Sequence, residues 1–199
     1  MDNTLAIFES SKEYLDCDII NISPNQGLAN ALREGFNHAI KLDRDIVVVM
    51  DSDNTQNPVL IGNMILKIAE GNDIVIASRY RYGARVVGLN AFRRLLSKMA
   101  SISFSSLIRL KGVKDYTCGF RAYNQVFLAS TMRDLGEQFI EQKGFGAMVE
   151  ILIKLGKRGA IITEIPMVLR YDQKVGDSKM NVKRTIIQSM GLLFKNAFK

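Results

Sequence analysis

The chain has 199 residues, of which 47% are hydrophobic and 24% are charged. That size and balance predict one folded domain with a sizeable core, and they exclude a disordered chain. No apolar run approaches the roughly 20 residues that span a bilayer, and no signal-peptide pattern opens the sequence, so we expect a chain that does not cross a membrane.

Charge is divided unevenly along the chain. Residues 1–60 carry 4 basic and 10 acidic side chains, whereas residues 61–199 carry 23 basic and 10 acidic ones. The second part is therefore expected to meet an anionic partner: a nucleic acid, a phosphorylated small molecule or an acidic lipid surface. Its basic residues are dispersed, without the interleaved aromatics of a single-strand binder, which argues against nucleic acid. Cys17 and Cys118 match no metal-ligand spacing and fit ordinary buried thiols.

The first elements in chain order predict a βαβ unit. Residues 3–14 have helical spacing, and residues 17–22 form a short, largely apolar strand. After a turn, residues 28–41 repeat apolar side chains at helical spacing, and a second strand follows at residues 45–50. Strand, helix and strand in this order predict a mostly parallel sheet with flanking helices, an α/β fold.

Two carboxylates directly follow the strand at residues 45–50. Its five consecutive apolar residues predict a strand buried on both faces inside a parallel sheet. Asp51 and Asp53 come next, and in an extended chain their side chains point the same way. Carboxylates at the carboxyl end of such a strand can hold Mg²⁺ or Mn²⁺ and leave coordination positions for phosphate oxygens. The alternative is that they cap the helix that Pro58 opens.

A further strand is expected to bring an arginine to the same edge of the sheet. Residues 73–77 are apolar after their first residue, and Arg79 lies just past their end. The planar guanidinium group suits a diphosphate better than other side chains do. A solvated surface arginine is the simpler alternative.

Two helices in the second half have the character of interfacial helices. Residues 91–110 are largely apolar but carry one stripe of basic and small polar side chains: Arg94, Lys98, Ser101, Ser105 and Arg109. Residues 180–199 form a basic amphipathic C-terminal helix. Helices of this kind lie in a bilayer interface, although burial in the core explains the first one equally well. Between them, the strand at residues 160–169 is broken by Pro166 and is expected at a sheet edge.

Several short motifs occur together over nearly the whole chain. They occupy residues 25–27 (NQG), 51–58 (DSDNTQNP), 73–80 (DIVIASRY), 115–121 (DYTCGFR), and 170 with 176–179 (R and GDSK). In this combination and order the chain resembles family 2 of the glycosyltransferases. Within that family it is most similar to the branch of dolichol-phosphate mannose synthase and the bacterial polyprenyl-phosphate glycosyltransferases.

The resemblance implies a fold and a reaction. The fold would be the GT-A type, and the reaction an inverting transfer of a sugar from a nucleotide-diphosphate donor to a polyprenyl (dolichyl or undecaprenyl) phosphate. The enzyme would act as a peripheral protein at the cytoplasmic face of the membrane. A hydroxyl acceptor on a polysaccharide, or a non-catalytic truncated homologue that binds membrane, are the alternatives.

The resemblance also implies roles for individual residues. The metal, Mg²⁺ or Mn²⁺, would be held by Asp51, Asp53 and Gln56. The donor would be bound by these three residues with Asn25 and Arg79. The catalytic residues would be Asp115 and Arg170. The acceptor phosphate would be bound by Arg93, Arg121, Ser178 and Lys179.

The chain departs from the family pattern at its N-terminus. Family members begin with a strand, a helix and a second strand, whereas this sequence opens at the turn that follows them, near residues 2–4. We therefore expect an N-terminally truncated transferase domain at residues 1–179. A fragment, a homo-oligomer or partner chain that supplies the missing part, and an inactive protein are the alternatives.

Overall fold

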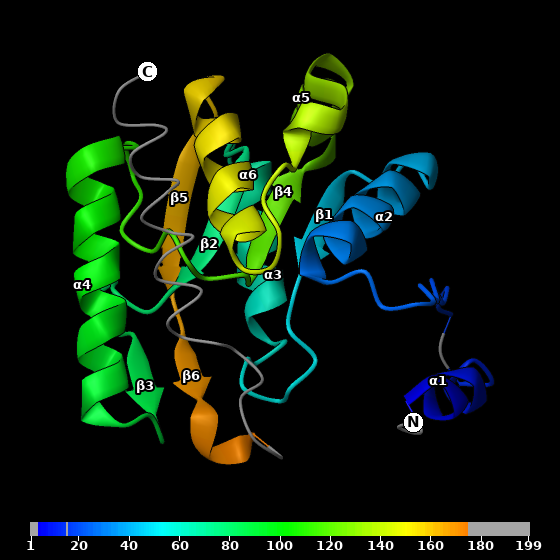
Figure 1. Cartoon of the computed structure of the whole chain (residues 1–199), viewed down its shortest axis with the longest axis horizontal. Coiled ribbons are helices and arrows are strands. Elements are labelled where there is room, and N and C mark those ends of the chain that lie inside the picture. Colours follow the sequence, from blue (N-terminus) through cyan, green and yellow to red (C-terminus); the bar gives the residue numbers. More distant parts are fainter. Residues whose placement is uncertain (1–3, 15, 175–199) are drawn as a thin grey trace.

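The computed structural model describes residues 4–14 and 16–174. Figure 1 shows most of its helices around a central sheet, with the first helix set apart from it. The predicted helix at residues 180–199, with Ser178 and Lys179, lies outside the described residues. The strands are β1 (Ile46–Val49), β2 (Ile74–Ser78), β3 (Arg85–Val87), β4 (Arg121–Asn124), β5 (Ile162–Pro166) and β6 (Val168–Arg170). The helices are α1 (Thr4–Ser11), α2 (Leu28–Lys41), α3 (Leu60–Ala69), α4 (Ala91–Ile108), α5 (Gln125–Leu135) and α6 (Gly146–Lys157). Two short 3₁₀ helices are η1 (Gly136–Phe139) and η2 (Tyr171–Gln173).

The α/β class is confirmed, but the prediction of a mostly parallel sheet is wrong. The four-stranded sheet has the order β1-β4-β2-β5. β2 and β5 are parallel, whereas β4 is antiparallel to both β1 and β2. The reason is that the chain enters β4 from a loop at the edge where β1 and β2 end, so β4 runs back between them. β1 and β2 still share one direction, and the residues that follow them meet at one edge.

The first strand of the predicted βαβ unit is not formed, and β1 is not a central strand. Residues 17–22 adopt no strand, and β4 is the neighbour of β1 among the described strands. An edge strand is covered less completely, so Val47 is buried and the other residues of β1 are half-buried. The strand buried over its whole length is β2.

The helices pack on the sheet through apolar faces, and for α2 this is the face that its spacing predicts. α2 buries Leu32 and Phe36, and α3 buries Met64 and Ile68. α6 is apolar around most of its surface and is therefore buried on most sides.

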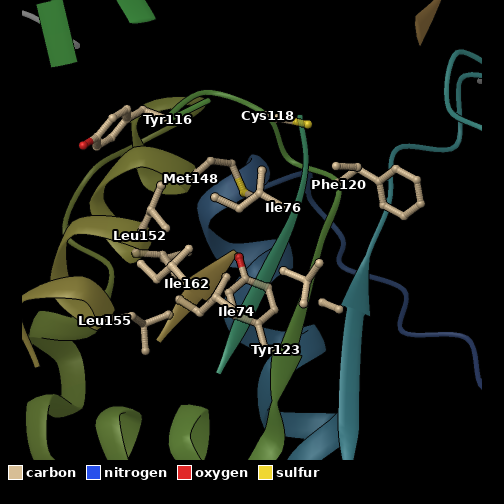
Figure 2. Close-up of a cluster of buried hydrophobic side chains, with 14 of the residues drawn as sticks. Ile74, Ile76, Tyr116, Cys118, Phe120, Tyr123, Met148, Leu152, Leu155 and Ile162 are labelled. Atoms are coloured by element: carbon tan, nitrogen blue, oxygen red, sulfur yellow. The ribbon is translucent and has the colours of Figure 1, made fainter. Parts of the chain in front are cut away.

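Figure 2 shows how α6 packs on the sheet: Met148 and Leu152 approach Ile74 and Ile76 of β2. All four side chains are at most 4% exposed. Full burial of such a side chain stabilises the fold by about 1.5–3 kcal/mol. This packing makes β2 and the residues at its end a rigid part of the molecule.

β5 and β6 are one segment that passes from the main sheet to a small second sheet. Pro166 ends β5 at the edge of the main sheet, which confirms the predicted edge strand and its break. The amide of Met167 then donates to the carbonyl of Ser78 at 3.0 Å, and its carbonyl accepts from the amide of Arg85 at 3.1 Å. β6 pairs in parallel with β3. The amide of Arg170, at the end of β6, donates to the carbonyl of Thr55 at 2.8 Å, which ties β6 to the loop after β1.

Candidate functional site

Asp51 follows β1 and is held by one side chain from the same loop. The amide group of Gln56 donates through Nε2 to Oδ2 of Asp51 at 2.8 Å, and its Oε1 accepts from the backbone amide of Asp51 at 3.0 Å. Desolvation of the carboxyl raises the pKa of Asp51, and the charge of Asp53 raises it further. Gln56 is buried, so its two bonds fix the direction of the Asp51 carboxylate.

Asp53 has partners at both oxygens. Its Oδ1 accepts from the hydroxyl of Thr55 at 2.6 Å and from the amide of Thr55 at 3.2 Å. Its Oδ2 accepts from the ammonium group of Lys174 at 2.8 Å. Burial opposes ionisation here, but the hydrogen bonds from Lys174 and Thr55 outweigh it and lower the pKa of Asp53. Asp53 is therefore an ionised carboxylate next to a cation.

The helix-capping alternative for the two aspartates is excluded. α3 begins at Leu60, and its N-cap Val59 makes no side-chain cap bond. The carboxamide that bonds near this terminus is that of Asn57, which accepts from the amide of Val59 at 3.0 Å. Asp51 and Asp53 thus stay at the carboxyl edge of the sheet.

Gly119 lies against Asp51 from the loop that leads into β4. A Cβ atom at Gly119 would lie 4.0 Å from each carboxylate oxygen of Asp51 and 3.6 Å from Cε of Met148. These are ordinary van der Waals distances, and they place the loop that leads into β4 directly beside the carboxylate of Asp51.

Arg79 and Asp115 form the most extensive ion pair at this edge. Nε and Nη2 of Arg79 donate to the two oxygens of Asp115 at 2.8 and 2.6 Å, and the amide of Arg79 donates to Oδ2 at 3.0 Å. The amide of Cys118 adds a bond to Oδ1 at 3.1 Å. Burial disfavours the charged form of both side chains, but the attraction and hydrogen bonds between them outweigh this effect. The pKa of Asp115 is therefore lowered and that of Arg79 is raised. The sequence prediction did not anticipate that these two candidates bind each other.

The loop that holds Asp115 is itself fixed by Glu164 of β5. Oε1 of Glu164 accepts from the backbone amides of Lys114 and Asp115, each at 2.7 Å. Oε2 lies 3.1 Å from Nε of Arg81. The family resemblance implies that Glu164 lies in a strand beside the acceptor site but does not make it a site residue, although a carboxylate inside an otherwise apolar strand is a signal of a buried polar contact.

Arg121 is placed in the core, which does not support its predicted contact with the acceptor phosphate. Its side chain is fully buried. Nη1 donates to the carbonyl of Met148 at 2.6 Å, and Nη2 donates to the carbonyl of Tyr116 at 2.7 Å. These bonds join β4, α6 and the Asp115 loop, so the guanidinium group has a structural role.

The other predicted site residues are spread over three places. Arg170 lies on the small sheet, where its guanidinium pairs in bidentate fashion with Asp172 at 2.7–3.1 Å. Asn25 lies in the turn before α2, where its Oδ1 accepts from the amide of Gly27 at 2.8 Å. Arg93 lies in α4, but its side chain is not among those described. The structure therefore brings together Asp51, Asp53 and Gln56, with Arg170 tied to the same loop.

The residues at Asp51 and Asp53 fit a divalent cation. The two carboxylates are the oxygen ligands that Mg²⁺ and Mn²⁺ prefer, and the ammonium of Lys174 already provides positive charge at Asp53. Within residues 4–14 and 16–174, no group of three His, Cys, Asp or Glu side chains is arranged to hold a metal. A cation at this pair would therefore need oxygens from a ligand or from water.

Comparison with known proteins identifies the family. The family model for glycosyl transferase family 2 matches residues 1–130. The chain belongs to that family. An undecaprenyl-phosphate mannosyltransferase of Micrococcus luteus is 28% identical to this family 2 chain over 163 residues, which are 82% of the chain and 64% of that protein. A dolichol-phosphate mannosyltransferase of Pyrococcus furiosus is 30% identical over 188 residues, 94% of the chain and 49% of that protein. The chain thus spans about half to two thirds of the length of these relatives.

Solved structures agree with the fold. The glucosyl-3-phosphoglycerate synthase of Mycobacterium tuberculosis, in complex with Mn²⁺, uridine-diphosphate-glucose and glycerol 3-phosphate, superposes with a TM-score of 0.57. It is 17% identical and covers 88% of this family 2 chain, and the match covers 57% of that protein. The α/β fold is therefore of the glycosyltransferase (GT-A) type that the sequence predicts.

Proposed function

We propose that this family 2 chain transfers a sugar, with inversion, from a nucleotide-diphosphate donor to a polyprenyl phosphate at a membrane. The observation that carries the proposal is the Asp51 and Asp53 pair at the edge where β1 and β2 end, joined through Thr55 to the strand of Arg170. Membership of the family supports the sugar transfer. The undecaprenyl-phosphate and dolichol-phosphate mannosyltransferases among its relatives support the lipid phosphate acceptor.

Asp51 and Asp53 would hold the divalent cation, Mg²⁺ or Mn²⁺, together with donor oxygens. Bound there, the cation supplies positive charge that stabilises the leaving diphosphate. The Mn²⁺ in the M. tuberculosis complex supports a divalent ion in this fold. Gln56 was predicted as a third ligand, and its bonds to Asp51 favour a role in orienting that carboxylate. Asn25 and Arg79 stay proposed donor contacts.

A phosphate acceptor suits the carboxylates of this site better than a hydroxyl acceptor does. A hydroxyl must lose its proton during attack and needs a general base, whereas a phosphate monoester is already anionic above its second pKa of about 6. Asp115, a predicted catalytic residue and a candidate base for a hydroxyl acceptor, has both oxygens bonded and its pKa lowered. It is poorly placed to take a proton.

Arg170→Ala is expected to lower the rate of transfer about 10- to 100-fold, because a charge-assisted contact to the acceptor phosphate contributes about 1.5–3 kcal/mol. The parent rate should be flat above pH about 7, where the phosphate is fully ionised. Initial rates against acceptor concentration from pH 6 to 9 measure both effects. A rate that keeps rising with pH, or an unimpaired variant, would argue for a hydroxyl acceptor.

A transfer assay tests the proposed function. The 199-residue chain is incubated with polyprenyl phosphate, Mg²⁺ or Mn²⁺ and a panel of radiolabelled nucleotide sugars, and the label in the organic phase is counted. We expect label from at least one donor to enter the lipid only when the metal is present. No labelled lipid from any donor, with or without metal, would refute the proposal for this chain.

Contact with the membrane is proposed through α4, on a different face from the stripe predicted from the sequence. Ser101 faces the protein, is 5% exposed and donates to the carbonyl of Lys114. Ser105 is half-buried, and Phe104 is buried beside it. The predicted stripe is therefore interrupted: Lys98 and Arg109 are exposed, whereas the serines between them turn towards the fold, where serine hydroxyls can bond to carbonyls.

The outer face of α4, formed by Leu95, Met99 and Ile102, is apolar and exposed. Each of these side chains is 56% exposed, and they follow one another at helical spacing. Residues 74–114, which include α4, contain 9 basic and no acidic residues. Exposed apolar side chains within a basic region are typical of peripheral contact with anionic lipid. No helix of the described residues is long and apolar enough to cross a bilayer.

Replacing Leu95, Met99 and Ile102 together with Ser is expected to lower binding to phosphatidylserine vesicles at least tenfold, because three apolar side chains lose their burial in lipid. Val126→Ser on α5 is the matched control, since Val126 is also exposed, at 72%, and it should change nothing. Sedimentation with vesicles at low and high salt measures the effect. Equal pelleting of the parent and the triple variant would exclude this face.

A further inference from the structure

Lys174 occupies the place next to Asp53 where a bound cation would act. Its Nζ lies 2.8 Å from Oδ2 of Asp53, and both side chains are partly shielded from water, at 23% and 32% exposed. Lys174 is not one of the residues that the family motifs single out. Its ammonium group places a positive charge at the carboxylate oxygen that a metal ion would bind.

The segment that carries Lys174 is held against the site by contacts that do not involve Lys174 itself. The amide of Arg170 is bonded to Thr55, two residues beyond Asp53. Asp172 pairs with the side chain of Arg170. On the other side, a Cβ atom at Gly88 would lie 2.4 Å from the amide nitrogen of Asp172, so the backbone at 172 is packed directly on a glycine. Lys174 therefore reaches Asp53 from an anchored segment.

The ammonium and a divalent cation compete for the same oxygen of Asp53. A divalent metal ion binds a carboxylate oxygen at about 2.0–2.1 Å. If it bound the oxygen that Lys174 contacts at 2.8 Å, the ammonium would lie within a few ångströms of this doubly charged ion. Like charges at that distance repel strongly in a partly shielded site. Binding of one cation at this oxygen therefore disfavours binding of the other.

We propose that Lys174 is an internal competitor for the metal site: it pairs with Asp53 in the metal-free protein and is displaced when the divalent cation binds. The proposal rests on the proposed function, because it takes the Asp51 and Asp53 pair as the metal site. It adds a residue that sets the metal affinity of the donor site. It also couples metal binding to the segment that holds Arg170, which lies four residues before Lys174.

The first test measures Mn²⁺ affinity by electron paramagnetic resonance, without any turnover. Lys174→Met is expected to bind Mn²⁺ about fivefold more tightly than the parent, the upper end of the range for a partly exposed ion pair. Lys143→Met, at an exposed lysine before α6, is the control for loss of one positive charge and should leave the affinity unchanged. Asp53→Asn should abolish the binding.

The second test follows the ammonium group directly. The full chain is labelled briefly with an amine-reactive acetyl ester, and acetylation at Lys174 and Lys143 is quantified by mass spectrometry. Saturating Mn²⁺ should raise the labelling of Lys174 several-fold and leave that of Lys143 unchanged. In Asp53→Asn, Lys174 should be labelled rapidly with or without Mn²⁺.

The outcomes separate the inference from the proposed function. If the parent binds Mn²⁺ but Lys174→Met binds it no more tightly, or if Mn²⁺ leaves the labelling of Lys174 unchanged, Lys174 is no competitor and the proposed metal site still stands. If neither the parent nor Lys174→Met binds Mn²⁺, both the competitor and the proposed metal site are wrong.

Discussion

Asp53→Asn is expected to weaken metal-dependent binding of a nucleotide sugar on the order of a hundredfold or more, because the cation loses one of two charged ligands at the diphosphate. The fold should tolerate the change. The Asp53 pair with Lys174 is partly exposed, at 32% for Asp53, so its loss should cost less than about 1 kcal/mol. Calorimetric titration with donor and Mn²⁺ measures the affinity, and thermal unfolding measures the stability.

Asp51→Asn extends the same test with a different effect on stability. Desolvation raises the pKa of Asp51, so its ionised carboxylate is disfavoured in the folded protein and an amide should not destabilise it. Donor affinity should nevertheless fall as it does for Asp53→Asn. A variant that unfolds early but keeps its donor affinity would show that the aspartates serve the fold and not the ligand.

Asp115→Asn is expected to have the largest effect on stability, a loss of about 3–5 kcal/mol, because it leaves the guanidinium of Arg79 in a buried site without its counter-charge. The side chain of Asp115 is 0% exposed and that of Arg79 is 13% exposed. The matched control is Asp134→Asn, which removes a surface pair with Arg158 whose side chains are 47% and 36% exposed. The control should cost less than about 1 kcal/mol. Urea unfolding measures both variants.

The pair also predicts a pH dependence and a rescue. The pKa of Asp115 is lowered from 3.8, so its contribution to stability is complete above pH about 4 and is lost as the pH falls through the lower folded-state value. Replacing Arg79 with Met and Asp115 with Leu together should recover part of the stability, because no charge stays buried alone. An Asp115→Asn protein as stable as the parent but inactive would show that Asp115 acts in catalysis and not in the fold.

The sequence was informative wherever a pattern reports the environment of a single element. Helical spacing located α2, and Pro58 marked the start of α3. The proline in 160–169 located the break between β5 and β6, and the carboxylates at the end of an apolar run located the edge of the sheet. Each of these follows from side-chain periodicity or backbone chemistry within one segment. The family motifs added the fold type, which the solved structures confirm.

The features that the sequence did not predict depend on which elements become neighbours. The apolar run of β1 suggested a central strand, but its neighbours leave it at the edge, and β4 runs antiparallel because of where its loop enters. The serines of α4 looked like part of an exposed polar stripe, yet Ser101 is buried and bonded. Nothing in the sequence around Arg121 indicates that it lies in the core, and nothing around Lys174 indicates that it pairs with Asp53. Which side chains and strands become neighbours is determined by the tertiary structure and not by the local sequence.

The composition of the lipid product tests the central claim most directly. The chain is incubated with polyprenyl phosphate, a donor nucleotide sugar and Mn²⁺, and the extracted lipid is analysed by mass spectrometry. We expect a lipid heavier than the acceptor by one sugar residue that still contains a single phosphorus atom, together with free nucleoside diphosphate. A lipid with two phosphorus atoms would show transfer of a sugar phosphate, and a glycosylated polyprenol in place of the phosphate would show a hydroxyl acceptor. Either product would contradict the account.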